Sequence, residues 1–95
     1  MEILSWYIND NLIGFSATNK HHLDMLFLDP NYFGKGYGTL ILRHLITNYH
    51  ITTVDVNEQN TSAFNFYTNH GFEISSRDMK DGMNLPYPIL HLSLK

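Results

Sequence analysis

Residues 32–41 read YFGKGYGTLI, a stretch in which three glycines stand at alternate positions directly before an apolar run. Lys35, between Gly34 and Gly36, is the only full positive charge in it. Glycine permits positive φ and lets a ligand approach the backbone closely. The first N–H groups of a helix lack intrahelical partners, and the helix dipole adds partial positive charge there. The stretch therefore predicts an anion-binding turn before a helix, with a purely steric turn as the alternative.

The residues before this loop predict three strands. Residues 2–8 and 12–18 are rich in β-forming side chains and flank the turn cluster Asn9-Asp10-Asn11, which indicates a hairpin. Residues 23–28 form a short apolar run that ends at Asp29-Pro30, as expected for a buried strand.

The residues after the loop predict two helices and three more strands. Leu42, Leu45, Ile46 and Tyr49 recur with helical spacing. The predicted helices cover residues 37–50 and 61–70, with Gly71 ending the second, and the predicted strands cover residues 51–56, 72–77 and 89–94. Turns are expected at Asp81-Gly82 and over residues 86–88. The order predicts one domain over residues 1–95 with a mixed sheet and two helices, an α/β or α+β fold.

Composition excludes several classes of function. The formal net charge is −3 and no basic run exists, which argues against a nucleic-acid surface. The chain has no cysteine, so disulfides and thiolate metal sites are excluded. The adjacent residues His21 and His22 would point to opposite faces of a strand, so no histidine metal site is expected either. Neither a membrane span nor a signal peptide is visible, and we expect a soluble cytoplasmic protein.

Two common phosphate motifs do not fit the loop. A Walker A loop needs Ser or Thr after its lysine, whereas Gly36 follows Lys35. The dinucleotide pattern G-x-G-x-x-G fails from Gly34 and from Gly36, although Asp55 lies about twenty residues further on, where a ribose-binding acid is expected. Dinucleotide binding therefore stays open as an alternative.

Two blocks of the sequence resemble the GNAT superfamily of acetyl-coenzyme A-dependent N-acetyltransferases. The first is residues 26–38, LFLDPNYFGKGYG, which is similar to the family's Arg/Gln-x-x-Gly-x-Gly/Ala signature after a strand. The second is Asn60-x-x-Ala63-x-x-Phe66-Tyr67-x-x-x-Gly71-Phe72. Residues 55–60 and 86–92 are similar to one bacterial subgroup of the superfamily. The resemblance covers most of the chain and implies a GNAT-like twisted sheet.

The sequence departs from the family pattern in two places. Phe33 occupies the first slot of the signature, where the family usually has Arg or Gln. The family's first strand and two helices, which form part of the acceptor site, are not expected here because the hairpin starts almost at Met1. The sheet edge near Trp6, Tyr7 and Phe15 is then expected to be exposed, which predicts a homodimer.

The resemblance implies roles for particular residues. The backbone of Leu26, Phe27 and Leu28 is expected to pair with the pantetheine arm, and Tyr67 to protonate the departing thiolate as general acid. Asn60 is expected either near the coenzyme or as a helix cap, and Asp24 as general base, with His22, Glu58 and His91 as other candidates. The residues expected to bind the pyrophosphate are Phe33, Gly34, Lys35, Gly36, Tyr37, Gly38 and Thr39.

The function expected from the resemblance is transfer of acetyl from acetyl-coenzyme A to an unknown primary amine by direct attack. One alternative is a non-catalytic acyl-coenzyme A binder or a degenerate domain. Another is an interaction module that reuses the fold and binds no coenzyme.

Overall fold

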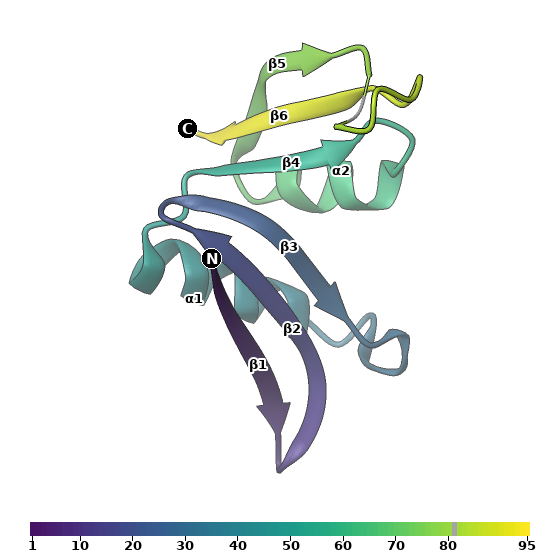
Figure 1. The fold of residues 1–95 in the computed structure, drawn as a ribbon. Helices are drawn as coiled ribbons and strands as arrows, with labels where there is room; N and C mark the ends of the chain where they lie inside the picture. Colours follow the sequence, from purple (N-terminus) through teal and green to yellow (C-terminus); the bar gives the residue numbers. More distant parts are fainter. Residues whose placement is uncertain (81) are drawn as a thin grey trace. The chain divides into compact units, whose positions relative to one another are not determined.

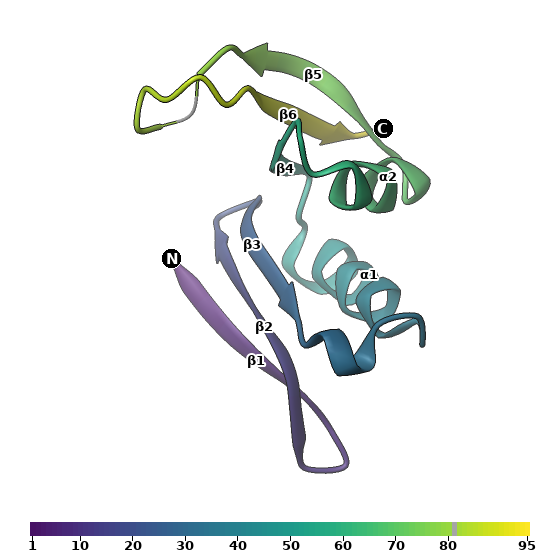
Figure 2. The ribbon, with the colours of Figure 1, turned by 90° about the vertical axis from the view of Figure 1, so that its right-hand side faces the viewer.

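A computed structural model describes residues 1–80 and 82–95, so the predicted turn at Asp81-Gly82 falls partly outside the described residues. The chain divides into two compact units, residues 1–52 and residues 53–95. Each unit combines three strands with one α-helix (Figures 1 and 2). This is the mixed α+β fold class that the sequence predicts.

The first unit is a three-stranded antiparallel sheet followed by a helix. Its strands are β1 (Glu2–Ile8), β2 (Asn11–Asn19) and β3 (His22–Leu28), with β2 in the middle. Asn9 and Asp10 join β1 to β2 with φ of 49° and 70°, and two positive φ values are typical of a type I′ hairpin turn. The predicted hairpin is confirmed.

The helix of the first unit, α1 (Tyr37–Tyr49), follows a short 3₁₀ helix, η1 (Pro30–Tyr32), that the sequence did not predict. In η1 the Asp29 carboxylate accepts a hydrogen bond from the Asn31 N–H at 2.9 Å, and this cap fixes the turn after β3. Figure 2 shows α1 running alongside β1–β3. The buried apolar residues of this unit are Ile13, Ala17, Leu23, Ile41, Leu42, Leu45 and Ile51.

The second unit has strands β4 (Thr53–Asn57), β5 (Phe72–Asp78) and β6 (Ile89–Leu94), with β6 in the middle and both neighbours antiparallel to it. Helix α2 (Thr61–Asn69) connects β4 to β5. The buried apolar residues of this unit are Val54, Val56, Tyr67, Phe72, Leu90 and Leu92.

The predicted start of the fourth strand is wrong by two residues. Ile51 is buried, but its N–H bonds to the Leu45 carbonyl and so closes the end of α1. The Thr52 N–H bonds to the His21 carbonyl. Both residues are therefore occupied by contacts of the first unit, and β4 begins at Thr53.

Candidate active site

The glycine loop combines left-handed backbone with the start of α1. Gly34 has φ of 74°, and Gly36, the N-cap of α1, has φ of 84°. A Cβ built on either glycine would meet no atom within 4 Å, so backbone conformation rather than packing requires glycine at both positions. No side chain caps α1 at Gly36. A helix start of this kind, with open space above the glycines, can accept an anion.

Lys35 lies near the ring of Tyr32. Its Nζ lies 5.9 Å from the centroid of the Tyr32 ring, within the range of a cation–π contact. The Tyr32 ring in turn meets the Tyr37 ring edge to face at 6.0 Å. Tyr32 was not among the predicted site residues, because its only signal in the sequence is that it lies three positions before Lys35.

Phe33 differs from the other predicted phosphate-binding residues. Its N–H already donates to the Pro30 carbonyl at 3.1 Å, and its side chain is 60% exposed. The amide of Phe33 is therefore used within η1. This leaves the amides of residues 34–39 as the better candidates for an anion.

Asp24 lies at an irregularity in β3. Ala17 of β2 pairs with Met25 and Thr18 pairs with Leu23, so Asp24 is the extra residue of a β-bulge. Bulges re-aim side chains and occur often beside active sites. The Asp24 carboxylate is exposed and lies 3.7 Å from the His22 ring. Leu26, Phe27 and Leu28 continue β3 toward η1, and all three pair with β2 along one edge.

Asn60 and Tyr67 belong to the second unit. The Asn60 side-chain oxygen accepts a hydrogen bond from the Ala63 N–H at 3.1 Å, so Asn60 is the N-cap of α2. Tyr67 is 7% exposed and packs against Phe66 and Phe72, with ring centroids 5.2 and 5.8 Å away. Burial raises the pKa of Tyr67 to about 12, so its phenol stays protonated at neutral pH.

Two of the candidate bases are engaged by other charged groups. Arg77 donates to both Glu58 oxygens, at 2.7 and 2.8 Å, and this hydrogen bonding lowers the pKa of Glu58. The His91 ring lies between Asp78, 2.7 Å from Nε2, and Asp55, 2.6 Å from Nδ1. Hydrogen bonds to Asp78 and then to Asp55 raise the pKa of His91, which favours the imidazolium. Neither group is well suited to accept a proton, so Asp24 and His22 remain the better candidates.

The position of Asp55 also bears on the dinucleotide alternative. Asp55 lies in the middle of β4, pairs with His91 in the sheet and bonds to its side chain. A ribose-binding acid is instead expected at the end of its strand. This arrangement gives the dinucleotide alternative no further support.

Among residues 1–80 and 82–95, no group of three His, Asp or Glu side chains is arranged to hold a metal ion. No helix in this part of the chain is long and apolar enough to span a membrane.

Comparison with known proteins places these features in a family. The family model for an acetyltransferase (GNAT) domain matches residues 1–85. The chain belongs to the GNAT acetyltransferase family. Its resemblance to this family, inferred from the glycine loop and the block after Asn60, is thus confirmed.

Individual relatives agree with this assignment. The chain is 40% identical to the peptidyl-lysine N-acetyltransferase YjaB of Salmonella typhimurium over 87% of its own length, and 37% identical to the Escherichia coli YjaB over 88%. The solution structure of apo YjaB from Escherichia coli superposes with a TM-score of 0.81 over 88% of this chain. The chain spans 57% of the length of each of these relatives.

A more distant structure shows the same fold. Arabidopsis thaliana Naa50, solved with the bisubstrate analogue CoA-Ac-MVNAL, is 23% identical and has a TM-score of 0.76, covering 94% of this chain and 69% of Naa50.

Proposed function

We propose that this chain binds acetyl-coenzyme A and transfers the acetyl group to a primary amine. The glycine loop is the observation that carries the proposal: Gly34 and Gly36 have positive φ at the start of α1, which no side chain caps, and among the described residues there is open space where a Cβ would stand on either glycine. Family membership supports the same activity. Because the YjaB relatives are named peptidyl-lysine N-acetyltransferases, we take a lysine side chain as the acceptor to test first.

Binding would rest on the loop, on residues of β3 and on Asn60. The amides of residues 34–39 would donate to the pyrophosphate, and Lys35 would add positive charge. The backbone of Leu26, Phe27 and Leu28 would pair with the pantetheine arm as an added strand would. Phe33 would contribute to coenzyme binding through its exposed ring rather than its amide. Asn60 would also contribute to coenzyme binding, in addition to capping α2.

The proposed reaction forms a C–N bond and breaks a C–S bond. The neutral amine attacks the thioester carbonyl carbon, and coenzyme A leaves as its thiolate. Asp24 would accept the proton that the amine nitrogen must lose. Tyr67 would give its phenolic proton to the thiolate sulfur, a role that the resemblance to the family implies and for which the phenol is in the required protonated form at neutral pH.

The first test is thermal unfolding with acetyl-coenzyme A, coenzyme A, NAD and ATP in parallel. A ligand at 100 times its Kd stabilises the folded state by about 2.7 kcal/mol. Stabilisation by the two coenzyme A compounds alone supports the proposed binding. Stabilisation by none of the four compounds would leave the loop as a steric turn and favour the interaction module, whereas stabilisation by NAD alone would favour dinucleotide binding.

The second test is acetyl transfer to a lysine-containing peptide. The chain has no cysteine, so a thiol reagent detects released coenzyme A without background from the protein. Release that depends on the peptide supports the enzyme. Binding without release, over a panel of amines, would instead indicate the non-catalytic acyl-coenzyme A binder.

We also propose that the chain forms a homodimer. The support is a set of exposed apolar side chains on β1–β3: Ile3, Tyr7, Phe15, Met25 and Phe27, which are 36–64% exposed. Light scattering over a range of concentrations tests the dimer, and a monomer throughout would overturn it.

A further inference from the structure

Strand β1 has one hydrogen-bonded neighbour. Within the described part of the chain it pairs with β2 alone, so the backbone groups on its other side have no strand partner there. Strand edges are usually protected by Lys, Pro or several charges. β1 has neither Lys nor Pro, and Glu2 is its only charged residue. Strand β5, which likewise pairs with one neighbour, carries Glu73, Arg77 and Asp78. The edge of β1 is therefore less protected than the edge of β5 against pairing with another strand.

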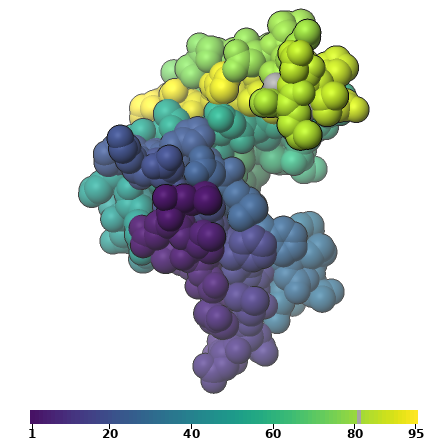
Figure 3. Space-filling model, in the orientation of Figure 1, coloured from purple at the N-terminus to yellow at the C-terminus, as the bar shows by residue number. Residues whose placement is uncertain are grey.

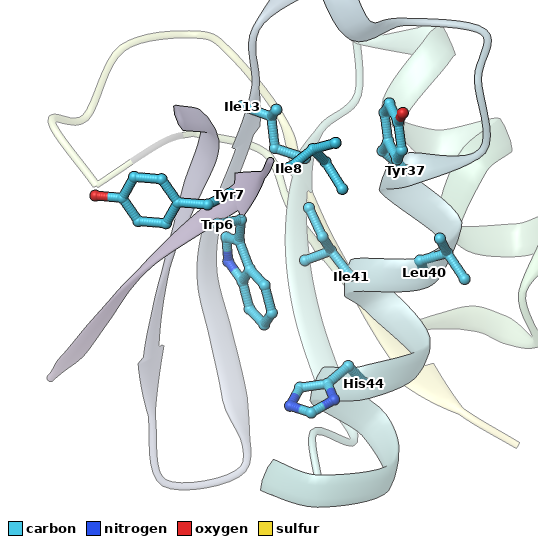
Figure 4. A pocket seen from close by; sticks show the side chains of 8 residues that line it. All are labelled: Trp6, Tyr7, Ile8, Ile13, Tyr37, Leu40, Ile41 and His44. Atoms are coloured by element: carbon cyan, nitrogen blue, oxygen red, sulfur yellow. The ribbon is translucent and has the colours of Figure 1, made fainter. Parts of the chain in front are cut away.

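A shallow apolar pocket adjoins this unprotected edge. Its volume is about 220 Å³, and Figure 4 shows Trp6 and Ile8 pointing toward α1 while Tyr7 points away from it. Trp6 meets His44 of α1 at a ring distance of 5.6 Å, and Leu40 of α1 is 63% exposed. In Figure 3 the purple residues of β1 lie on the surface of the first unit. A strand added to β1 would therefore cover apolar side chains as well as bond to the backbone.

We infer that the edge of β1 pairs with β1 of a second copy, antiparallel and centred on Ser5. Ser5 is the midpoint of the seven-residue strand, so this register pairs the strand over its whole length. Leu4 then faces the partner's Trp6, and Ile3 faces the partner's Tyr7. Residues directly opposite in an antiparallel pair share a face of the sheet. Each of these pairs is therefore apolar on both sides.

Charge and size also favour this register. Glu2 meets the partner's Ile8, so no like charges are opposed, and two small serines meet at the centre. A stable interface buries about 800 Å² per partner, roughly one-eighth of the 6217 Å² that the chain exposes. Seven residues of strand backbone do not supply this area alone, so the proposed interface also needs the large side chains beside the edge, Trp6, Tyr7 and Leu40. The inference specifies the surface of the proposed homodimer and is independent of the transfer reaction.

The experiment uses single cysteines in a chain that has none. In this register two Ser5→Cys side chains lie directly opposite each other, with Cα atoms about 4.5–5.5 Å apart, within reach of a disulfide. Two Glu2→Cys residues lie six positions apart along the pair, about 20 Å, and cannot be bridged. We expect mild oxidation at low protein concentration to convert Ser5→Cys to a covalent dimer and to leave Glu2→Cys unlinked. Equal linking of the two variants, or none for Ser5→Cys while the parent is a dimer, would overturn the inference.

A second variant separates loss of pairing from loss of folding. Ser5→Lys places like charges directly opposite each other and is expected to give a monomer in light scattering. Ser5→Thr, which keeps a small side chain at the same exposed position, is expected to stay dimeric. Both variants should unfold cooperatively and should respond to acetyl-coenzyme A in the same way as the parent. A Ser5→Lys variant that remains a dimer with this unfolding behaviour would show that the copies associate elsewhere.

Discussion

The Trp6 indole N–H donates a hydrogen bond to the Ser16 hydroxyl at 3.0 Å, and Ser16 is fully buried. Trp6 is half-buried on the α1 side of the sheet, whereas Tyr7 and Phe15 are exposed. A buried donor that loses its partner costs more than the hydrogen bond itself contributes.

Replacement of Ser16 by alanine removes this acceptor. We expect the free energy of unfolding to fall by about 1–3 kcal/mol, measured by chemical denaturation. In a Trp6→Phe background the donor is absent, so the same Ser16→Ala change should cost clearly less. Equal costs in the two backgrounds would contradict the role of the hydrogen bond.

Gly14 in β2 is expected to be the least replaceable glycine. A Cβ at this position would lie 2.2 Å from the backbone oxygen of Phe27, so Gly14→Ala must push β2 and β3 apart. Overpacking of this kind costs about 1–3 kcal/mol, occasionally more. Gly82→Ala is the matched control, because its Cβ meets nothing within 4 Å. Thermal unfolding should show a large loss for the first variant and little change for the second.

Gly36→Ala separates ligand binding from folding. The residue has φ of 84° with open space around its missing Cβ, so alanine adds backbone strain of about 1–2 kcal/mol without a clash. Because the added methyl group would stand where the pyrophosphate is proposed to approach, we expect acetyl-coenzyme A binding to weaken at least tenfold, measured by calorimetry. An unchanged Kd in the folded variant would count against the loop as the binding site.

Tyr67→Phe removes the proposed general acid and keeps the ring that packs on Phe72. A positioned acid typically contributes about 10²–10⁴-fold to the rate. We expect kcat to fall within that range while the Kd for acetyl-coenzyme A stays the same. Phe66→Leu, which changes the neighbouring ring, serves as the packing control. If Tyr67→Phe turns over at the parental rate, Tyr67 has only its packing role.

The contacts of His91 with Asp78 and Asp55 predict that the free energy of unfolding depends on pH. The pKa of His91 is raised in the folded state, chiefly by Asp78 and then by Asp55. The unfolded value is about 6.5. The stabilisation of the folded state by the contacts of protonated His91 with Asp78 and Asp55 is therefore fully present below about pH 6.5. It is lost as the pH rises through the higher pKa of His91 in the folded state.

His91→Gln tests this sign. The stability difference between parent and variant should be largest at about pH 5.5 and should shrink toward pH 9. His44→Gln is the control, since the contacts of His44 within the described part of the chain are with Trp6, Tyr49 and Asn48. A His91→Gln difference that grows with pH would refute the assignment.

The sequence predicted the elements because their patterns are local. Strand alternation, helical spacing and the Asn9-Asp10 turn depend on neighbouring residues, and the predicted element boundaries lie within two residues of those observed. Asn60 as a helix cap was also one of the two predicted roles, and the hydrogen bond to Ala63 confirms it.

The remaining features depend on register between strands. The bulge at Asp24 arises from how β3 pairs with β2, and the two carboxylates around His91 come from β4 and β5, on either side of its own strand β6. No pattern of residue spacing in the sequence predicts the bulge or the contacts of His91. The roles proposed for Asp24, Tyr67 and the loop residues remain predictions for the same reason, since they depend on a bound substrate.

The uncapped start of α1 has a consequence for local motion. Without a side-chain partner at Gly36, the first turn of α1 should open more readily than the turns around buried Leu42 and Leu45. An anion seated on that turn would close it. Amide hydrogen exchange over residues 37–39 should therefore slow on addition of acetyl-coenzyme A, which makes this helix end a built-in reporter of occupancy.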